Sequence, residues 1–186
     1  MPRYCRINRV IRDIPSTNVV AGNRNTSLRQ DVARELERRG ERCNCIRCRE
    51  IRGSYMQKTD LELQDLVYQT GVSEEHFLSY DTEDDRLAGF LRLSLPYENN
   101  LLELQDLEGA AIIREVHVYG QSLEVGTEQA GAAQHAGLGK NLIQKAEEIA
   151  RAQGYNRLAV IAAVGTRQYY AMRGFEMGEL YMVKPL

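Results

Sequence analysis

The chain has 186 residues and a net charge of −2, and it contains no apolar run near the ~18 residues that a membrane-spanning helix needs. Its first residues, 1–4, are polar and basic, so nothing predicts secretion. We therefore expect a soluble, cytoplasmic protein with no membrane partner. In such a reducing compartment, the four cysteines suit free thiols or metal ligands better than disulfides.

Charge is distributed unevenly along the sequence. Residues 1–52 contain 13 arginines, no lysine and 6 acidic residues, whereas the remainder has 11 basic and 20 acidic residues. Guanidinium groups match phosphate oxygens and stack on bases, so nucleic acid is a candidate partner of this segment. The alternative is a basic face that docks onto an acidic neighbouring domain. We predict a basic unit at 1–52 and an α/β domain at 53–186, which begins with a polar joint at 53–60.

The basic unit contains one short predicted helix. Ser27 and Gln30 have the spacing of a capping box, and apolar residues then recur at helical spacing until Gly40. The other faces of this helix carry arginines, which can meet solvent or phosphate: Arg29, Arg34, Arg38 and Arg39.

All four cysteines also lie in the basic unit. Cys43, Cys45 and Cys48 fall within six residues, and Cys5 comes earlier. Four thiolates suit a structural, tetrahedral zinc ion, and neighbouring arginines favour the thiolate form. Buried or redox-active thiols are the alternative. An iron–sulfur cluster is less favoured, because C-x-C-x₂-C is not a usual cluster spacing, and we expect none in this chain.

The second domain alternates between strand-like and helical patterns. The charged stretch 81–85 predicts a turn between two antiparallel neighbours. The predicted strands are Leu61–Gln69, His76–Tyr80, Leu87–Leu95, Ala110–Tyr119, Leu158–Val164 and Leu180–Val183. The predicted helices run from about Leu138 to Gln153 and from Thr166 to Arg173.

A glycine motif precedes the longer predicted helix. Gly137 and Gly139 lack a Cβ, so backbone amides there can approach a bulky anion, and the start of the helix adds its positive dipole end. A pyrophosphate fits such a site, although a glycine-rich loop without a ligand is the alternative. The run Gln134–Gly139 reads Q-x-x-G-x-G, which resembles motif A of the GNAT acetyltransferases. In that family the motif holds the pyrophosphate of acetyl-coenzyme A.

A second stretch resembles the same family. Tyr170–Phe175 reads Y-x-x-x-G-F, and in GNAT proteins the tyrosine of this signature donates a proton to the departing coenzyme A thiolate. The resemblance implies this role for Tyr170, although Tyr169 or Tyr170 could instead pack a helix onto the sheet. It also implies the GNAT fold, an α/β fold with a mixed, mostly antiparallel central sheet.

The strand before motif A is the expected site of the acyl group. Glu115 and His117 share one face of this strand, and either could activate water as a base, or could serve only as a hydrogen-bond anchor. The main chain of Val116 and Val118 would bond the pantetheine arm as an added strand does. The full set of expected coenzyme-binding residues is Glu115, Val116, His117, Val118, Gln134, His135, Gly137, Leu138, Gly139, Lys140, Tyr169 and Tyr170.

Several blocks together resemble the catalytic subunit of Elongator, a tRNA wobble-uridine carboxymethyl synthase family. These blocks are Tyr4–Ile7, Arg9–Pro15, Leu28–Gln30, Cys43–Glu50, Arg114–Gly120, Gln134–His135, Tyr169–Tyr170 and Tyr181–Lys184. The resemblance implies that this domain presents acetyl-coenzyme A, that a radical activates its acetyl methyl group for attachment to uridine, and that the thioester is hydrolysed. The radical S-adenosylmethionine domain would be supplied separately, because its cysteine motif is not in this chain.

The resemblance also implies that the basic unit grips tRNA. The expected contacts are Arg6, Arg9, Arg12, Arg47 and Arg49. We therefore expect an acetyl-coenzyme A-binding, tRNA-associated domain with tRNA-stimulated thioester hydrolysis. The alternatives are a lysine or small-amine N-acetyltransferase and a non-catalytic RNA-binding scaffold.

Overall fold

The computed structural model describes residues 1–8, 15–51, 60–98, 103–119 and 133–186, without the side chains of 133–136. Within these residues the chain forms two compact units, Met1–Glu50 and Ile51–Leu186. The predicted joint at 53–60 lies, except for Asp60, outside the described residues. No helix in the described ranges is long and apolar enough to cross a membrane.

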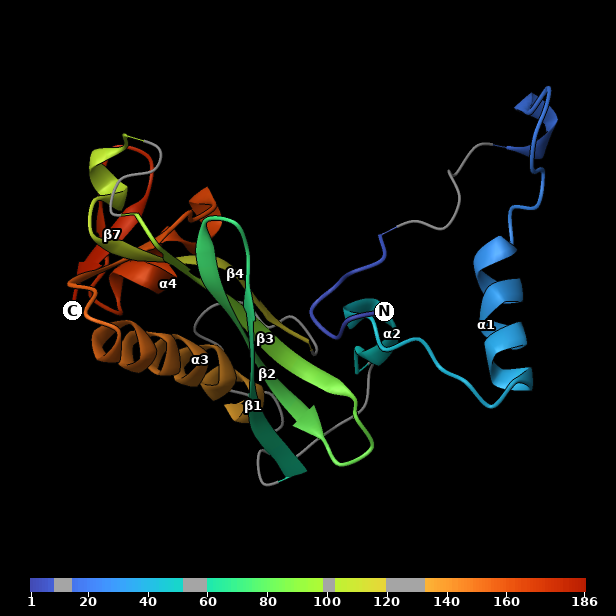
Figure 1. Ribbon diagram of the computed structural model, residues 1–186, viewed down its shortest axis with the longest axis horizontal. Helices are drawn as coiled ribbons and strands as arrows, with labels where there is room; N and C mark the ends of the chain where they lie inside the picture. Colours follow the sequence, from blue (N-terminus) through green and yellow to red (C-terminus); the bar gives the residue numbers. More distant parts are fainter. Residues whose placement is uncertain (9–14, 52–59, 99–102, 120–132) are drawn as a thin grey trace. The chain divides into compact units, whose positions relative to one another are not determined.

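The described residues of the first unit form the short helical elements η1 (Ser16–Asn18), α1 (Leu28–Arg38) and α2 (Ile46–Arg49) (Figure 1). α1 ends before Gly40, whose φ of +67° reverses the chain as predicted. The predicted capping box is wrong, because the Ser27 side chain makes no capping hydrogen bond. Asn25 takes part instead: its carbonyl oxygen accepts the Ser27 amide at 2.8 Å, and its amide nitrogen bonds to Asp31.

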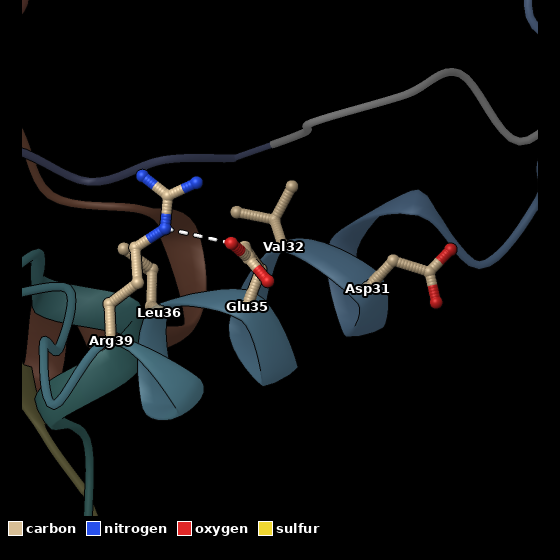
Figure 2. A pocket seen from close by; sticks show the side chains of 5 residues that line it. All are labelled: Asp31, Val32, Glu35, Leu36 and Arg39. Atoms are coloured by element: carbon tan, nitrogen blue, oxygen red, sulfur yellow. Dashed lines mark hydrogen bonds and ion pairs between the residues drawn. The ribbon is translucent and has the colours of Figure 1, made fainter.

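α1 has no buried residue, and a shallow pocket follows one side of it. Figure 2 shows that α1 and its C-cap residue supply all five lining side chains, which are Asp31, Val32, Glu35, Leu36 and Arg39. Glu35 is already engaged there, because the Nε of Arg39 lies 2.8 Å from its carboxylate. A pocket walled by a single helix lacks the converging polar groups of a ligand site, so we do not assign a function to it.

The second unit is built on a seven-stranded sheet in the order β1-β2-β3-β4-β5-β7-β6. The strands are β1 (Leu61–Gln69), β2 (Ser73–Thr82), β3 (Leu87–Pro96), β4 (Ala110–Val118), β5 (Arg157–Val160), β6 (Glu176–Met177) and β7 (Met182–Pro185). Among these seven described strands, only β4 and β5 pair in parallel, and the other ladders are antiparallel. The predicted mixed, mostly antiparallel sheet is confirmed.

The long helix α3 (Ala133–Ala152) packs against β3 and β4 and lies along the sheet in Figure 1. Its apolar positions recur at helical spacing and meet the alternate residues of the strands, which explains why they are buried. The fully buried residues include Leu78, Leu91, Leu93, Ile113, Leu138, Leu142 and Leu158. The remaining elements are η3 (Gln105–Leu107), η4 (Val164–Thr166) and α4 (Arg167–Ala171).

A buried carboxylate anchors the chain between β6 and β7. The two oxygens of Asp106, in η3, accept the backbone amides of residues 179, 180 and 181 at 3.1, 2.7 and 2.9 Å. The amide of Tyr181 is the main cause that lowers the Asp106 pKa below its ordinary value, with the other two amides acting in the same direction against burial. η3 and the last two strands are therefore held together by one side chain.

Candidate coenzyme and metal sites

Among the residues that the structure describes, no strand pairs with the edge of β4 beyond the point where β5 ends, and we call this the open edge. The parallel ladder runs from Ala110–Arg157 to Ile113–Val160, and β4 continues for five residues, to Val118. The Tyr119 amide donates to the carbonyl of Ala88, in β3, at 2.8 Å. Because backbone groups alternate in direction along a strand, those of Val116 and Val118 point to the opposite side, toward the gap that β5 leaves.

Glu115, the first candidate base, is held by an arginine of the neighbouring strand. Arg92 Nε donates to Glu115 Oε2 at 3.0 Å, and the guanidinium also lies 5.6 Å from the ring centroids of Phe77 and Phe90. The ion pair occupies one of the two carboxylate oxygens. Glu115 is thus arranged more like an anchor than like a free base.

His117, the second candidate base, lies among aromatic rings on the same face of β4. Its ring centroid is 6.0 Å from that of Phe90 and 4.6 Å from that of Tyr119. It is half-buried. The rings hold the imidazole in place, and no carboxylate in the described part of the chain forms an ion pair with it. Its nitrogens are therefore suited to a water molecule.

The glycine motif lies inside α3 and not in a loop before it. We predicted that the helix begins at Leu138, but it begins at Ala133. Amides from the fifth residue of a helix onward bond to carbonyls four residues earlier, so those of residues 137–140 are directed into the helix. The helix start that offers unpaired amides is therefore one turn earlier, at residues 133–136. The side chains of Gln134 and His135 lie outside the described residues.

The other residues of the motif differ in exposure. Leu138 is fully buried in the core, so its side chain serves packing, whereas Lys140 is exposed. Apart from the nearby backbone of α3 itself, no atom of the described residues lies within 4 Å of where a Cβ on Gly137 would stand. At Gly139, by contrast, a Cβ would lie 2.5 Å from the Tyr169 hydroxyl oxygen. The absence of a side chain at Gly139 thus allows α4 to approach α3.

Tyr169 is the centre of an aromatic stack on α4. The Arg173 guanidinium lies 3.4 Å from the Tyr169 ring centroid, and Arg173 also donates to the Tyr169 carbonyl. The Tyr169 ring meets Tyr170 edge to face at 5.3 Å, and Tyr170 meets Phe175 at 5.6 Å. The stack joins Tyr169 and the tyrosine of the Y-x-x-x-G-F signature, Tyr170, to the phenylalanine that ends it.

Tyr170, the proposed proton donor, is 7% exposed. Burial, assisted by Tyr169, raises its pKa to about 12. This is roughly three and a half units above the pKa of a free thiol, so full proton transfer to a thiolate would be uphill by about 5 kcal/mol. A phenol in this position is better suited to stabilise a thiolate by donating a hydrogen bond.

Three of the four cysteines form a compact cluster in the first unit. The sulfurs of Cys43, Cys45 and Cys48 lie within 4.8 Å of one another. Sulfurs that share a tetrahedral zinc ion are about 3.8 Å apart, so a small contraction would fit the metal. Cys5 is not part of the cluster, although its backbone carbonyl accepts the Ile46 amide at 2.9 Å. The set can hold a metal ion, with Cys5 adjacent in the backbone.

The cluster favours a thiolate at one position. Burial, the largest influence, raises the Cys45 pKa, but the amides of Ile7 and Cys48 and the neighbouring thiols outweigh it and lower the pKa to about 7. Burial and the negative charge at Cys45 raise the pKa of Cys48 to about 11. The negative charge thus concentrates on Cys45, because neighbouring thiols titrate as a coupled set.

The predicted tRNA-binding arginines are placed differently from one another. Arg6 is exposed, and Arg47 is half-buried and donates to the Asn8 carbonyl at 2.7 Å. Arg49 is only 4% exposed. Arg9 and Arg12 lie outside the described residues.

An acidic hollow also lies beside β1 and β2 in the second unit. It is lined by Asp60, Leu61, Glu62, Asp81, Thr82, Glu83 and Asp84. A diphosphate would be repelled there, so this hollow is not the coenzyme site.

Comparison with known proteins now identifies the fold. The profile of the Acetyltransferase (GNAT) family matches residues 45–175. The chain belongs to this family. The opened sheet, α3 and the tyrosine signature described above are thus features of a GNAT domain.

Relatives of this GNAT chain align over all of it. A protein of Dehalococcoides mccartyi named tRNA uridine(34) acetyltransferase is 41% identical over 193 residues, which is 41% of that protein. One of the same name in Methanocaldococcus jannaschii is 36% identical over 196 residues, 36% of its length. Elongator complex protein 3 of Danio rerio is 37% identical over 193 residues, 35% of its length. The chain therefore spans about two fifths of the relatives' length, and the resemblance inferred from the sequence is confirmed.

A solved structure agrees with these relatives. The archaeal Methanocaldococcus infernus Elp3 with an N-terminal deletion superposes with a TM-score of 0.82 at 31% identity. The match covers 100% of this GNAT chain and 45% of the other.

Sequence reasoning missed two arginines that hold site residues. Arg92 could have been noticed, because it is the only charge in the otherwise apolar strand Leu87–Pro96. Arg173 gave no such signal, since only the folded α4 brings its guanidinium over Tyr169.

Proposed function

We propose that this chain is the acetyl-coenzyme A-binding part of a tRNA uridine(34)-modifying enzyme. The proposal is carried by the open edge of β4, where the main chain of Val116 and Val118 faces the gap beyond Val160. An extended pantetheine arm can bond there as an added strand. The relatives named tRNA uridine(34) acetyltransferase support the choice of substrate.

The thioester would then lie between two groups of side chains. Tyr170 donates a hydrogen bond to the coenzyme sulfur and stabilises the thiolate that leaves. His117 activates a water molecule, and Glu115, fixed by Arg92, serves as its polar neighbour. The result would be hydrolysis of the acetyl thioester, or its release after the acetyl group has been used elsewhere.

The diphosphate would lie at the start of α3. Unpaired amides at residues 133–136 and the positive dipole end of a 20-residue helix favour an anion there. The open space over Gly137 leaves room for it, whereas Tyr169 covers Gly139. Gln134, His135 and Lys140 complete this part of the proposed site.

The first unit would bind zinc and tRNA. Cys43, Cys45 and Cys48 supply three thiolates, and Cys5 supplies the fourth after a side-chain rearrangement. Of the arginines, Arg6 is exposed and can meet phosphates directly. Arg47 and Arg49 would help to shape the backbone around the cysteines. Arg9 and Arg12 stay predicted tRNA contacts. The radical chemistry would come from the further length that the relatives have.

A thioesterase assay tests this function. Acetyl-coenzyme A hydrolysis by the full chain should rise when tRNA is added, and Gly139→Asp should abolish it, because the new side chain displaces Tyr169 and adds negative charge near the diphosphate. Gln144→Asp, an exposed position of the same helix, is the control with the same charge change. tRNA affinity should be retained in both variants. Hydrolysis that is absent in the wild type with and without tRNA would contradict the proposed reaction.

A non-catalytic RNA-binding scaffold is the second candidate. It is favoured by the direction of the 137–140 amides into α3 and by the Tyr169 hydroxyl over Gly139. Calorimetry separates the two, because a scaffold would give no heat on titration with acetyl-coenzyme A while still binding tRNA.

A further inference from the structure

One side chain of α1 reaches the cysteine cluster within the first unit. Arg29 Nη2 donates to the Cys48 sulfur at 3.7 Å. Its second terminal nitrogen, Nη1, is buried and has no hydrogen-bond partner among the described residues. No residue of α1 is buried as a whole, so the buried Nη1 of Arg29 is unusual for this helix.

The placement of Arg29 has an electrostatic reason. A zinc ion bound by three or four thiolates carries net negative charge, which nearby hydrogen-bond donors offset. Cys45 receives such donors from the backbone, through the amides of Ile7 and Cys48. Cys48 receives a charged side-chain donor from Arg29, and charge-assisted hydrogen bonds are the stronger kind.

We propose that Arg29 is a positioning residue for the metal in the first unit. Its guanidinium holds the Cys48 sulfur as a ligand and ties α1 to α2, so that zinc binding orders α1. This inference rests on the zinc site proposed above. It adds a link between the metal and a helix that contributes none of the ligands.

Arg34 provides a matched comparison on the same helix. Its side chain is 72% exposed, and it pairs with Asp31 at 3.1 Å. It lies five residues beyond Arg29, and among the described residues it does not share the contact of Arg29 with a sulfur. Arg29→Gln and Arg34→Gln therefore remove the same charge from the same helix. Only the first removes the donor to Cys48.

Zinc affinity of the full chain is the first test. Competition with a chelator of known affinity should show binding weakened about 10- to 100-fold in Arg29→Gln, the range typical for partners of metal ligands. Arg34→Gln should leave the affinity unchanged, and Arg29→Lys should fall between, because it keeps the charge without the forked donor geometry. Equal affinities in Arg29→Gln and Arg34→Gln would overturn the inference.

Hydrogen exchange of α1 is the second test. Zinc should slow exchange of the amides of Leu28–Arg38 in the wild type and in Arg34→Gln, but not in Arg29→Gln. Zinc-dependent protection that persists in Arg29→Gln would show that another contact orders the helix and would refute the inference. If the wild type binds no zinc, both the proposed zinc site and the role of Arg29 are refuted. If zinc binds equally well to Arg29→Gln and Arg34→Gln, only the role of Arg29 is refuted.

Discussion

Replacing Gly139 by alanine tests the contact between α3 and α4. A Cβ at this position would lie 2.5 Å from the Tyr169 hydroxyl oxygen but 3.7 Å from the ring carbon that bears it. The first distance is too short for two non-bonded atoms, whereas the second is an ordinary contact. The effect of Gly139→Ala should therefore depend on whether residue 169 carries a hydroxyl.

The magnitude follows from two opposing terms. In a helix interior, alanine is more favourable than glycine by about 1 kcal/mol. Forcing an extra methyl group into a packed contact costs about 1–3 kcal/mol. Gly139→Ala should thus range from neutral to about 2 kcal/mol destabilising in the wild type. With Tyr169→Phe in place, the same change should stabilise by about 1 kcal/mol.

The coupling between positions 139 and 169 is measured by urea unfolding of four proteins, followed through the transition of the second unit. These are the wild type, Gly139→Ala, Tyr169→Phe and the variant with both changes. Gly137→Ala is the matched control, because nothing lies within 4 Å of its added Cβ, and it should stabilise the protein with or without Tyr169→Phe. If Gly139→Ala changes the free energy of unfolding equally in both backgrounds, the reasoning about Tyr169 is refuted.

Three further predictions concern stability and metal binding. Asp106→Ala should lower the free energy of unfolding by about 2–4 kcal/mol, because three amides lose a charged acceptor. Since the folded pKa of Asp106 is lowered, the stability that this carboxylate contributes should be present above about pH 4 and lost as the pH falls through the folded pKa. An acid titration of stability that is unchanged in the variant would contradict this. The hydrogen bond to Asp65 is the main cause that raises the His76 pKa. The stability that His76 contributes to the fold should therefore be complete below the unfolded pKa and disappear as the pH rises through the folded pKa. His76→Gln should remove this pH dependence of the free energy of unfolding from denaturation curves. Cys45→Ser should release zinc and loosen residues 1–50 while it spares the second unit, and unchanged zinc by mass spectrometry would exclude Cys45 as a ligand.

The strands were predictable because their patterns are local. The β1 bounds match the prediction, β2 extends it at both ends, and β3 extends it by one residue. The bounds of the last two predicted strands are wrong: Leu158–Val164 is a strand only as far as Val160, and Leu180–Val183 is shifted to Met182–Pro185. The start of α3 was predicted five residues late, because glycines usually interrupt a helix, while packing here continues it through Gly137 and Gly139. β6, with two residues, is too short to give any alternation in the sequence.

The site was predictable in its residue types but not in their partners. The spacing of Glu115 and His117 places both on one face of β4, as the structure has them. The pairing of Glu115 with Arg92 depends on the register of β3 against β4, which includes an irregularity beside Arg92. The contact of Tyr169 with Gly139 joins residues 30 positions apart in sequence, and no local pattern encodes it.

The open edge of β4 has a consequence for how this domain tolerates sequence change. What it offers at residues 116 and 118 is peptide groups, which are the same whatever side chain stands there. Substitution by isoleucine or threonine would preserve them, whereas proline would delete a donor and fix the backbone angle. A lineage could therefore exchange the side chains along this edge freely and keep the surface that an extended ligand meets.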